Sequence, residues 1–354
     1  MTWEGPGFVD HHVHLLRYAA KDFPSYDLTD PASIARYHRS ISSRWSTPMD
    51  EQPPLGEVED LPGSLERGLQ WAADLGLVQV TEAGITDWRY LDALLDRREK
   101  GLLPVRVRVL AASGIADART MPRYGDPWVE VIGVKFYADG WLGPRTCALC
   151  QPFTDDDDND GVLFLDADTL ARRADPFAEA GWVVATHAIG DRAIEAVLDA
   201  YERIYGEDCA SVGPRIEHAQ VLRPDLIERM AHLGVVACIQ PGFAVSDAPS
   251  AREGLGRERM EHAYDWRALL AAGVPVIAGS DFPIESLSPL EGLRRLVAGV
   301  AEEGGEQVAE TLPLDDALAV MTDASAGTTL LSDDPHDLDP HHFGRITVEA
   351  TRPT

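Results

Sequence analysis

The stretch Gly7-Phe8-Val9-Asp10-His11-His12-Val13-His14 decides the fold, because it joins an apolar strand to two histidines in alternate positions. In an extended segment, side chains two residues apart point to the same side. His12 and His14 therefore share one side, whereas His11 faces the other and is expected to be structural. Two imidazoles on one side can chelate a borderline metal such as zinc. The pair alone is a weak signal, so its meaning depends on the rest of the chain.

Seven further apolar runs, rich in β-branched residues, follow along the chain at 77–82, 105–110, 131–136, 182–187, 215–218, 235–239 and 276–281. Their continuous apolar character is typical of parallel strands buried on both faces. Amphipathic helical patterns separate most of them, at 64–73, 91–100, 167–179, 193–204, 224–232 and 265–272. Eight such units predict an α/β fold, the (β/α)8 TIM barrel, formed by residues 1–354 as a single domain.

Two segments fall outside this repeat. Residues 16–62 form an insertion that includes Pro24, Pro31, Pro48, Pro53 and Pro54, and we expect it to lie near the barrel mouth and to contain a short helix near 34–41. Residues 327–354 are expected to form an irregular C-terminal tail.

The chain of 354 residues is strongly acidic, with 31 Lys and Arg against 59 Asp and Glu and a formal net charge of −28. Because phosphate backbones are bound by basic surfaces, this balance argues against a nucleic-acid partner. It favours solubility. It is also compatible with a cationic substrate, although a solvated acidic surface is the simpler interpretation.

No run of about 18 apolar residues occurs, so neither a membrane span nor a membrane partner is expected. The first residues lack the basic and apolar regions of a signal peptide, which makes a cytoplasmic location the default expectation. Four cysteines are too few for a disulfide framework. The pair Cys147 and Cys150 forms a CxxC motif, which alone is a weak signal for redox or zinc chemistry.

Polar residues stand at the ends of several predicted strands, where TIM barrels carry their catalytic groups. His187, His218 and Asp281 end the fifth, sixth and eighth strands. One buried histidine would most simply be a core residue, but histidines and a carboxylate at several strand ends predict a metal site. Asp281 can serve both as a ligand and as a base for a bound water, whose pKa a metal lowers to about 7.

Lys135 lies inside the fourth apolar run, where a charged ammonium group is costly to bury. Two interpretations remain open from the residues alone. The amine is neutral and acts as a base or Schiff-base former, or it is carboxylated by carbon dioxide to a carbamate that bridges two metals.

Five blocks of this sequence resemble the amidohydrolase superfamily, in the branch that includes N-substituted formamide deformylase. They are the opening stretch and residues 135–146, 187–193, 215–220 and 279–283. Their order and approximate spacing agree from about residue 5 to about residue 325. The resemblance implies hydrolysis of a C–N bond in a small molecule (an amide, formamide, carbamate or cyclic amide) by a metal-activated hydroxide.

The resemblance also implies roles for individual residues. His12 and His14 would hold the more buried of two zinc ions, carboxylated Lys135 would bridge both, and His187 and His218 would hold the second. Asp281 would ligate the first metal and carry a proton to the leaving amine. The implied substrate contacts are Trp141, Arg145 and Gln240.

Members of this branch usually begin with strands of a small β-sandwich. Because the HxH motif starts at residue 12, we expect most of that sandwich to be missing, and a homodimer is a further expectation. Trp141, Cys147 and Cys150 stand where smaller residues are common, which suggests an altered pocket.

Two alternatives to a binuclear zinc enzyme remain. One is a mononuclear metal deaminase, in which Lys135 is not carboxylated and His218 protonates the substrate. The other is a binding protein without activity. The number of metals per chain separates the three: two, one or none.

Overall fold

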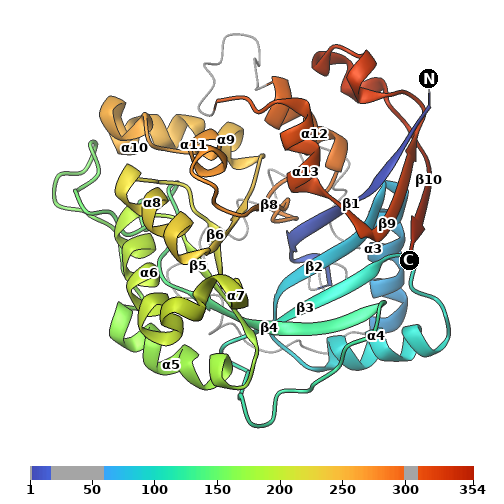
Figure 1. Cartoon of the computed structure of the whole chain (residues 1–354), viewed down its shortest axis with the longest axis horizontal. Coiled ribbons are helices and arrows are strands. Elements are labelled where there is room, and N and C mark those ends of the chain that lie inside the picture. Colours follow the sequence, from blue (N-terminus) through green and yellow to red (C-terminus); the bar gives the residue numbers. More distant parts are fainter. Residues whose placement is uncertain (1, 17–59, 299–309) are drawn as a thin grey trace.

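The computed structural model describes residues 2–16, 60–298 and 310–354 of the chain (Figure 1). The predicted insertion at 16–62, with its short helix near 34–41, therefore lies almost wholly outside the described residues. Among the helices that are described, none has the length and apolar character needed to cross a bilayer.

All eight predicted parallel strands are present, and each pairs with the next in the chain to form one large sheet. They are β1 (Trp3–Val13), β2 (Leu77–Ile85), β3 (Arg106–Ala112), β4 (Val129–Tyr137), β5 (Val183–Ala188), β6 (Arg215–His218), β7 (Val236–Ile239) and β8 (Val276–Ala278). Most of their residues are buried, as expected for strands covered on both faces.

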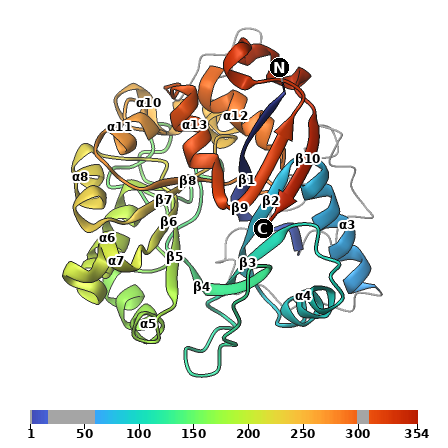
Figure 2. The same ribbon diagram turned by 45° about the vertical axis from the view of Figure 1, so that its right-hand side comes forward.

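The six predicted helices also form, and Figures 1 and 2 show helices arranged around the outside of the sheet. They are α3 (Leu61–Asp74), α4 (Arg89–Glu99), α5 (Ala167–Glu179), α6 (Asp191–Tyr205), α8 (Pro224–Leu233) and α11 (Trp266–Ala271). Local sequence explains their ends. The Asp166 side chain accepts a hydrogen bond from Thr169 N at the start of α5, and Gly234 takes the left-handed conformation that ends α8.

Among the described residues, five further helices were not predicted. They are α7 (Cys209–Val212), α9 (Phe243–Ser246), α10 (Ala248–Met260), α12 (Pro289–Ala298) and α13 (Leu314–Met321). Helix α10 has a weak amphipathic pattern, because Gly254 and Gly256 interrupt it and Gly256 has a non-helical backbone. The short helices α7 and α9 span only one turn, too little for a periodic pattern to be recognised.

The prediction of an irregular tail at 327–354 was wrong. Strand β9 (Thr322–Leu331) runs antiparallel to the first half of β1, and β10 (Val348–Pro353) pairs with β9 (Figure 2). Two 3-10 helices, Pro335–Asp337 and Pro340–Arg345, connect these strands. Distant contacts hold β9 in place: buried Thr329 donates from Oγ1 to Gly76 O at 3.1 Å and accepts from Phe8 N at 3.2 Å. Because these partners are distant in sequence, no local pattern in this Thr- and Ala-rich strand predicts them.

The end of β1 is also bonded to the segment that follows β8. Asp281 N donates to His12 O, and His14 N donates to Phe282 O, each at 2.7 Å. The ladder itself is limited to one parallel bridge, between Val13 and Phe282, and the strand order runs from β10 to β8 without closing. The structure thus shows an α/β fold with a large, mainly parallel sheet, and the TIM barrel remains a prediction.

Gly279 lies where the backbone after β8 passes closest to β1. A Cβ atom at this position would lie 2.5 Å from His12 N and 2.6 Å from His12 Cβ, closer than side chains tolerate. Gly279→Ala should therefore push the two segments apart and destabilise the protein by about 1–3 kcal/mol, the usual range for overpacking. Urea unfolding of both proteins measures this loss.

The matched control is Gly344→Ala, since a Cβ there would meet nothing within 4 Å. This change should alter stability by less than about 0.5 kcal/mol, as for most surface substitutions. Equal unfolding curves for Gly279→Ala and the unmodified protein would contradict the close approach.

Candidate metal centre

A cavity of about 210 Å³ lies at the carboxyl ends of the parallel strands. Six of the nine predicted site residues line it: His12, His14, Trp141, His187, His218 and Asp281. They come from the ends of β1, β5 and β6, with His14 directly after β1, and from the loops after β4 and β8. The folded chain thus brings together histidines that are far apart in the sequence.

Two imidazoles converge on one carboxylate oxygen. Oδ1 of Asp281 lies 3.4 Å from Nε2 of His12 and 3.2 Å from Nε2 of His14. This oxygen is buried and makes no hydrogen bond of good geometry. A buried acceptor without a donor is costly. Two nitrogens and one oxygen in such a compact group fit a divalent metal of the zinc type.

The hydrogen bonds behind three imidazoles set which ring nitrogen is available. His12 Nδ1 donates to Glu217 Oε2 at 2.5 Å, and His218 Nδ1 donates to Gln240 Oε1 at 2.8 Å. His187 Nε2 donates to Gly140 O at 2.9 Å. In a neutral imidazole the other nitrogen carries a lone pair, which is the form that ligates metals.

His12 and His218 are held neutral by their surroundings. Burial and, after it, the positive charge of Lys135 lower the pKa of His12 to about 4. Burial, followed by His187 and His12, also lowers the pKa of His218 well below its ordinary value. The ring centroids of His187 and His218 lie only 4.5 Å apart, so the second pair predicted to share a metal is close in space.

Lys135 is almost fully buried, with 1% of its surface exposed, and does not line the cavity. Its Nζ lies 5.1 Å from the ring centroid of Tyr137. Burial lowers the pKa of Lys135 to about 8, while the charges of Glu217 and Asp281 oppose that shift. Near neutral pH a larger fraction of this amine is therefore neutral than in an exposed lysine. Both interpretations of Lys135, a neutral amine and a carbamate, stay open.

Glu217 is the main site residue that sequence reasoning missed. It is fully buried on β6 and accepts hydrogen bonds from Nε of Arg215 at 2.7 Å and from the Arg215 NH2 group at 3.0 Å. Burial alone would raise the pKa of Glu217, but Arg215, His12 and Lys135 together lower it well below the ordinary value. The ionised carboxylate thus orients His12. Its position two residues after Arg215 repeats the alternate pattern of the HxH motif, a signal that could have revealed it.

Two of the predicted ligands have an uncommon backbone. His218 has φ 79° and Asp281 has φ 56°, the left-handed region that side chains rarely occupy. Such strain is found mainly where surrounding structure enforces it, often at functional sites. Here the hydrogen bond from Asp281 N to His12 O enforces it at one of them.

Two further carboxylates hold the site together without entering it. Asp139 accepts hydrogen bonds from the backbone N of Ala148, Ile189 and Gly190 at 2.9, 3.1 and 2.9 Å, which fastens the loop after β4 to the end of β5. Asp10 Oδ1 accepts from the backbone N of His12 at 3.1 Å and of Ser280 at 2.9 Å. Each carboxylate therefore joins two strand ends.

Of the three predicted substrate contacts, the structure brings only Trp141 to the cavity wall. Arg145 instead forms an ion pair with Asp155 at 2.6 Å and donates to Leu142 O. Gln240 lies behind His218, and its Nε2 donates to Cys238 O at 3.1 Å, so it positions a histidine. Cys147 is buried and Cys150 exposed, both as free thiols.

A parallel sheet that ends in two histidines and an aspartate around one cavity defines an α/β protein with a candidate metal centre. The chain belongs to the amidohydrolase family, whose model matches residues 42–334. The family predicted from the sequence is thereby confirmed. The matched range begins after His12 and His14, so these two residues are metal-ligand candidates on the geometry of the cavity alone.

Two relatives are similar in sequence. The chain is 34% identical over 274 residues to the Bacillus subtilis (strain 168) protein YtcJ, covering 71% of this chain and 51% of that protein. It is 34% identical over 156 residues to N-substituted formamide deformylase of Arthrobacter pascens, covering 43% of this chain and 28% of that enzyme. The chain thus spans about half the length of YtcJ.

Among solved structures, the chain is similar to an uncharacterized metal-dependent hydrolase from Pyrococcus horikoshii. The TM-score is 0.75 and the identity 22%, over 96% of this chain and 88% of that one. At this identity the likeness shows the fold.

Glu217→Gln should weaken metal binding about 10- to 100-fold, the usual effect of losing a carboxylate behind a metal-ligating histidine. The measurement is zinc affinity by competition with a chelator, with circular dichroism to verify folding. Glu130→Gln is the control, because Glu130 also pairs with an arginine on a neighbouring strand, Arg108 at 3.2 Å, but outside the site. Unchanged zinc affinity in folded Glu217→Gln would contradict the orienting role.

Proposed function

We propose that this protein is a metal-dependent hydrolase that cleaves a C–N bond in a small molecule. One observation carries the proposal: Nε2 of His12 and of His14 converge on an Asp281 oxygen that has no hydrogen bond. Membership of the amidohydrolase family supports it. An amide, formamide, carbamate or cyclic amide is the expected substrate, and a cavity of about 210 Å³ suits a small one.

We also propose that the parallel sheet closes into a (β/α)8 barrel. The bridge between Val13 and Phe282 and the two hydrogen bonds beside it join the first parallel strand to the segment after the last. Closure would place the predicted ligands at the carboxyl end of the barrel, where catalytic groups of this fold are found.

His12, His14 and Asp281 would hold the first zinc ion, with Lys135 as a further ligand. His187 and His218 would hold a second. Zinc in such a site supplies a Lewis acid and lowers the pKa of water. Asp281 is ionised, because His12 and His14 lower its pKa even though burial raises it. Its carboxylate would take a proton from the attacking water and deliver it to the departing nitrogen.

We propose that Lys135 is carboxylated. Its neutral amine nitrogen attacks carbon dioxide, one proton leaves, and a carbamate with two oxygens remains. The low pKa of Lys135, about 8, supports this step because more of the amine is unprotonated near neutral pH. The resulting anion would lie between the two histidine pairs and replace a buried cation by a ligand shared between two metals.

A mononuclear deaminase is the second candidate. His12, His14 and Asp281 form a compact group by themselves, with ligand atoms within 4.8 Å of one another. That group is sufficient for one metal, and His218, whose Nε2 is not used by Gln240, would then act on the substrate. Metal content of the purified protein separates two ions from one.

Asp281→Ala should lower turnover of an amide substrate by roughly 10²- to 10⁴-fold or more, the contribution of general acid–base groups, because it removes a metal ligand and the proton carrier together. Steady-state kinetics measure the loss, and thermal unfolding tests whether the fold persists. The control is Asp199→Ala, which removes a carboxylate that pairs with Arg229 on the surface. Full activity in Asp281→Ala would exclude this residue as the proton carrier.

Lys135→Ala should reduce the metal content from about two ions per chain to about one, because it removes the proposed carbamate ligand that both ions share. Added acetate should partly restore metal content and activity, because it supplies a carboxylate to the vacated space. Elemental analysis with and without acetate is the measurement. Two tightly bound ions in Lys135→Ala without acetate would contradict the bridging role, and one ion in the unmodified protein would favour the deaminase.

A further inference from the structure

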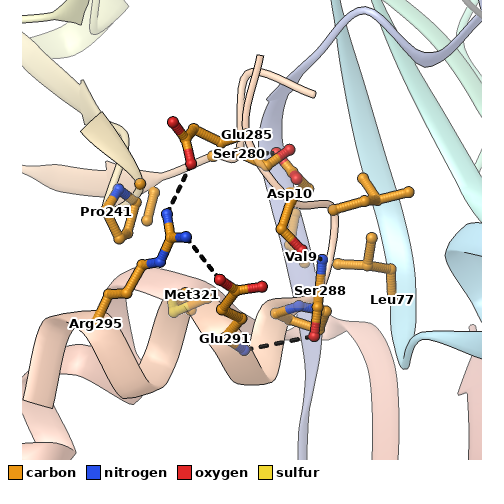
Figure 3. Close-up of a pocket in the computed structure, with 17 residues that line it drawn as sticks. Val9, Asp10, Leu77, Pro241, Ser280, Glu285, Ser288, Glu291, Arg295 and Met321 are labelled. Carbon is orange, nitrogen blue, oxygen red and sulfur yellow. Dashed lines mark hydrogen bonds and ion pairs between the residues drawn. The ribbon is translucent and has the colours of Figure 1, made fainter. Parts of the chain in front are cut away.

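Three carboxylates line the cavity, and two of them are already matched by positive or metal-ligating groups. Asp281 belongs to the histidine group described above. Glu285 accepts a hydrogen bond from NH1 of Arg295 at 2.7 Å, and NH2 of Arg295 binds Glu291 at 2.6 Å (Figure 3). Glu285 therefore has a cationic partner, which it shares with Glu291.

Asp247 is different, because its hydrogen-bond partners are neutral side chains. It stands between α9 and α10, and its Oδ2 accepts from Gln220 Nε2 at 3.1 Å and from the Tyr264 hydroxyl at 3.3 Å. Within residues 2–16, 60–298 and 310–354, no lysine, arginine or histidine forms an ion pair with it. Gln220 and Tyr264 fix the carboxylate on the cavity wall but leave its charge uncompensated.

The surroundings of Asp247 disfavour its ionised form. Burial, together with the negative charges of Glu285 and Asp281, raises its pKa to about 7, even though Gln220 and Tyr264 act in the opposite direction. A carboxylate in this position is stabilised by whatever cation enters the cavity. The proposed hydrolytic chemistry does not use the Asp247 carboxylate.

Three aromatic side chains, Tyr137, Trp141 and Phe243, line the same cavity. Aromatic faces carry negative potential and attract cations, an interaction worth about 2 kcal/mol when water is excluded. A fixed carboxylate beside several rings is the chemistry that recognises a positively charged nitrogen. The net charge of −28 adds attraction of cations from solution.

We propose that Asp247 is a specificity-determining residue that binds a protonated amine of the substrate, while the aromatic side chains surround it. The inference deepens the proposed function and rests on it: the substrate would be a small amide or formamide carrying an ammonium group in addition to its scissile C–N bond. The acidic composition, which a solvated surface explains equally well, would then also serve substrate capture.

The test measures binding, so it does not depend on turnover. Zinc-loaded protein is titrated with benzylammonium and with benzyl alcohol, which are similar in size but differ in charge. The unmodified protein should bind benzylammonium at least about tenfold more tightly. In Asp247→Asn this preference should fall to within about twofold, since the amide keeps the shape and loses the charge.

Glu258→Gln is the matched control, because it removes one exposed carboxylate from α10, the helix that follows Asp247. It should keep the full preference for the cation. A preference that survives in folded Asp247→Asn, for example through coordination of the amine to zinc, would overturn the proposal. Should Asp247→Asn not fold, equal affinity of the unmodified protein for both probes would overturn it as well.

Failure of the proposed function has a different signature. If the protein hydrolyses no amide, neutral or cationic, the proposed hydrolase function is rejected, but the binding preference for the cation can still be measured. A protein that hydrolyses neutral amides as fast as their ammonium-bearing counterparts would keep the hydrolase and reject the role of Asp247.

Discussion

The metal centre depends on the hydrogen bonds that join the end of β1 to the segment after β8. Asp281 N to His12 O and His14 N to Phe282 O lock together two segments from opposite ends of the sequence. The bond between Asp10 and Ser280, 270 residues apart, adds a third tie. These bonds hold Asp281 in a left-handed backbone that aims its carboxylate at the two imidazoles. The cavity, its ligands and the proposed chemistry follow from this junction.

Charge compensation is the second constraint. Burying an isolated charge is expensive, and it is tolerated when partners and hydrogen bonds are complete. Arg215 and Glu217 form an ion pair, Glu217 also orients His12, and Arg295 pairs with Glu285 and Glu291. Against this background the remaining exceptions are informative. The free oxygen of Asp281 fits a metal, the buried amine of Lys135 fits carboxylation, and Asp247 fits a cationic substrate.

Periodicity predicted the strands and the larger helices, because a buried strand or an amphipathic helix is visible in its own residues. It failed where the stabilising contacts are distant. Strand β9 is held by Phe8 and Gly76, so residues 327–331 looked irregular in isolation. Likewise Arg145 lies in the loop after β4, close in sequence to the cavity residue Trp141, but its side chain pairs with Asp155. No pattern within the loop predicts that ion pair.

The sequence by itself determined the family, through the five blocks that resemble the amidohydrolase superfamily. It also supplied the metal-ligand candidates His12, His14, His187, His218 and Asp281, because alternate spacing and strand ends bring them to the carboxyl ends of the parallel strands. Only the tertiary structure decided which groups hydrogen-bond to those ligands and which others line the cavity. Glu217 meets His12 through the pairing of strands far apart in the chain, and Asp247 reaches the cavity through a short helix without periodicity. The physical reason is that ligand geometry follows from local backbone alternation, whereas support and specificity arise from packing between distant segments.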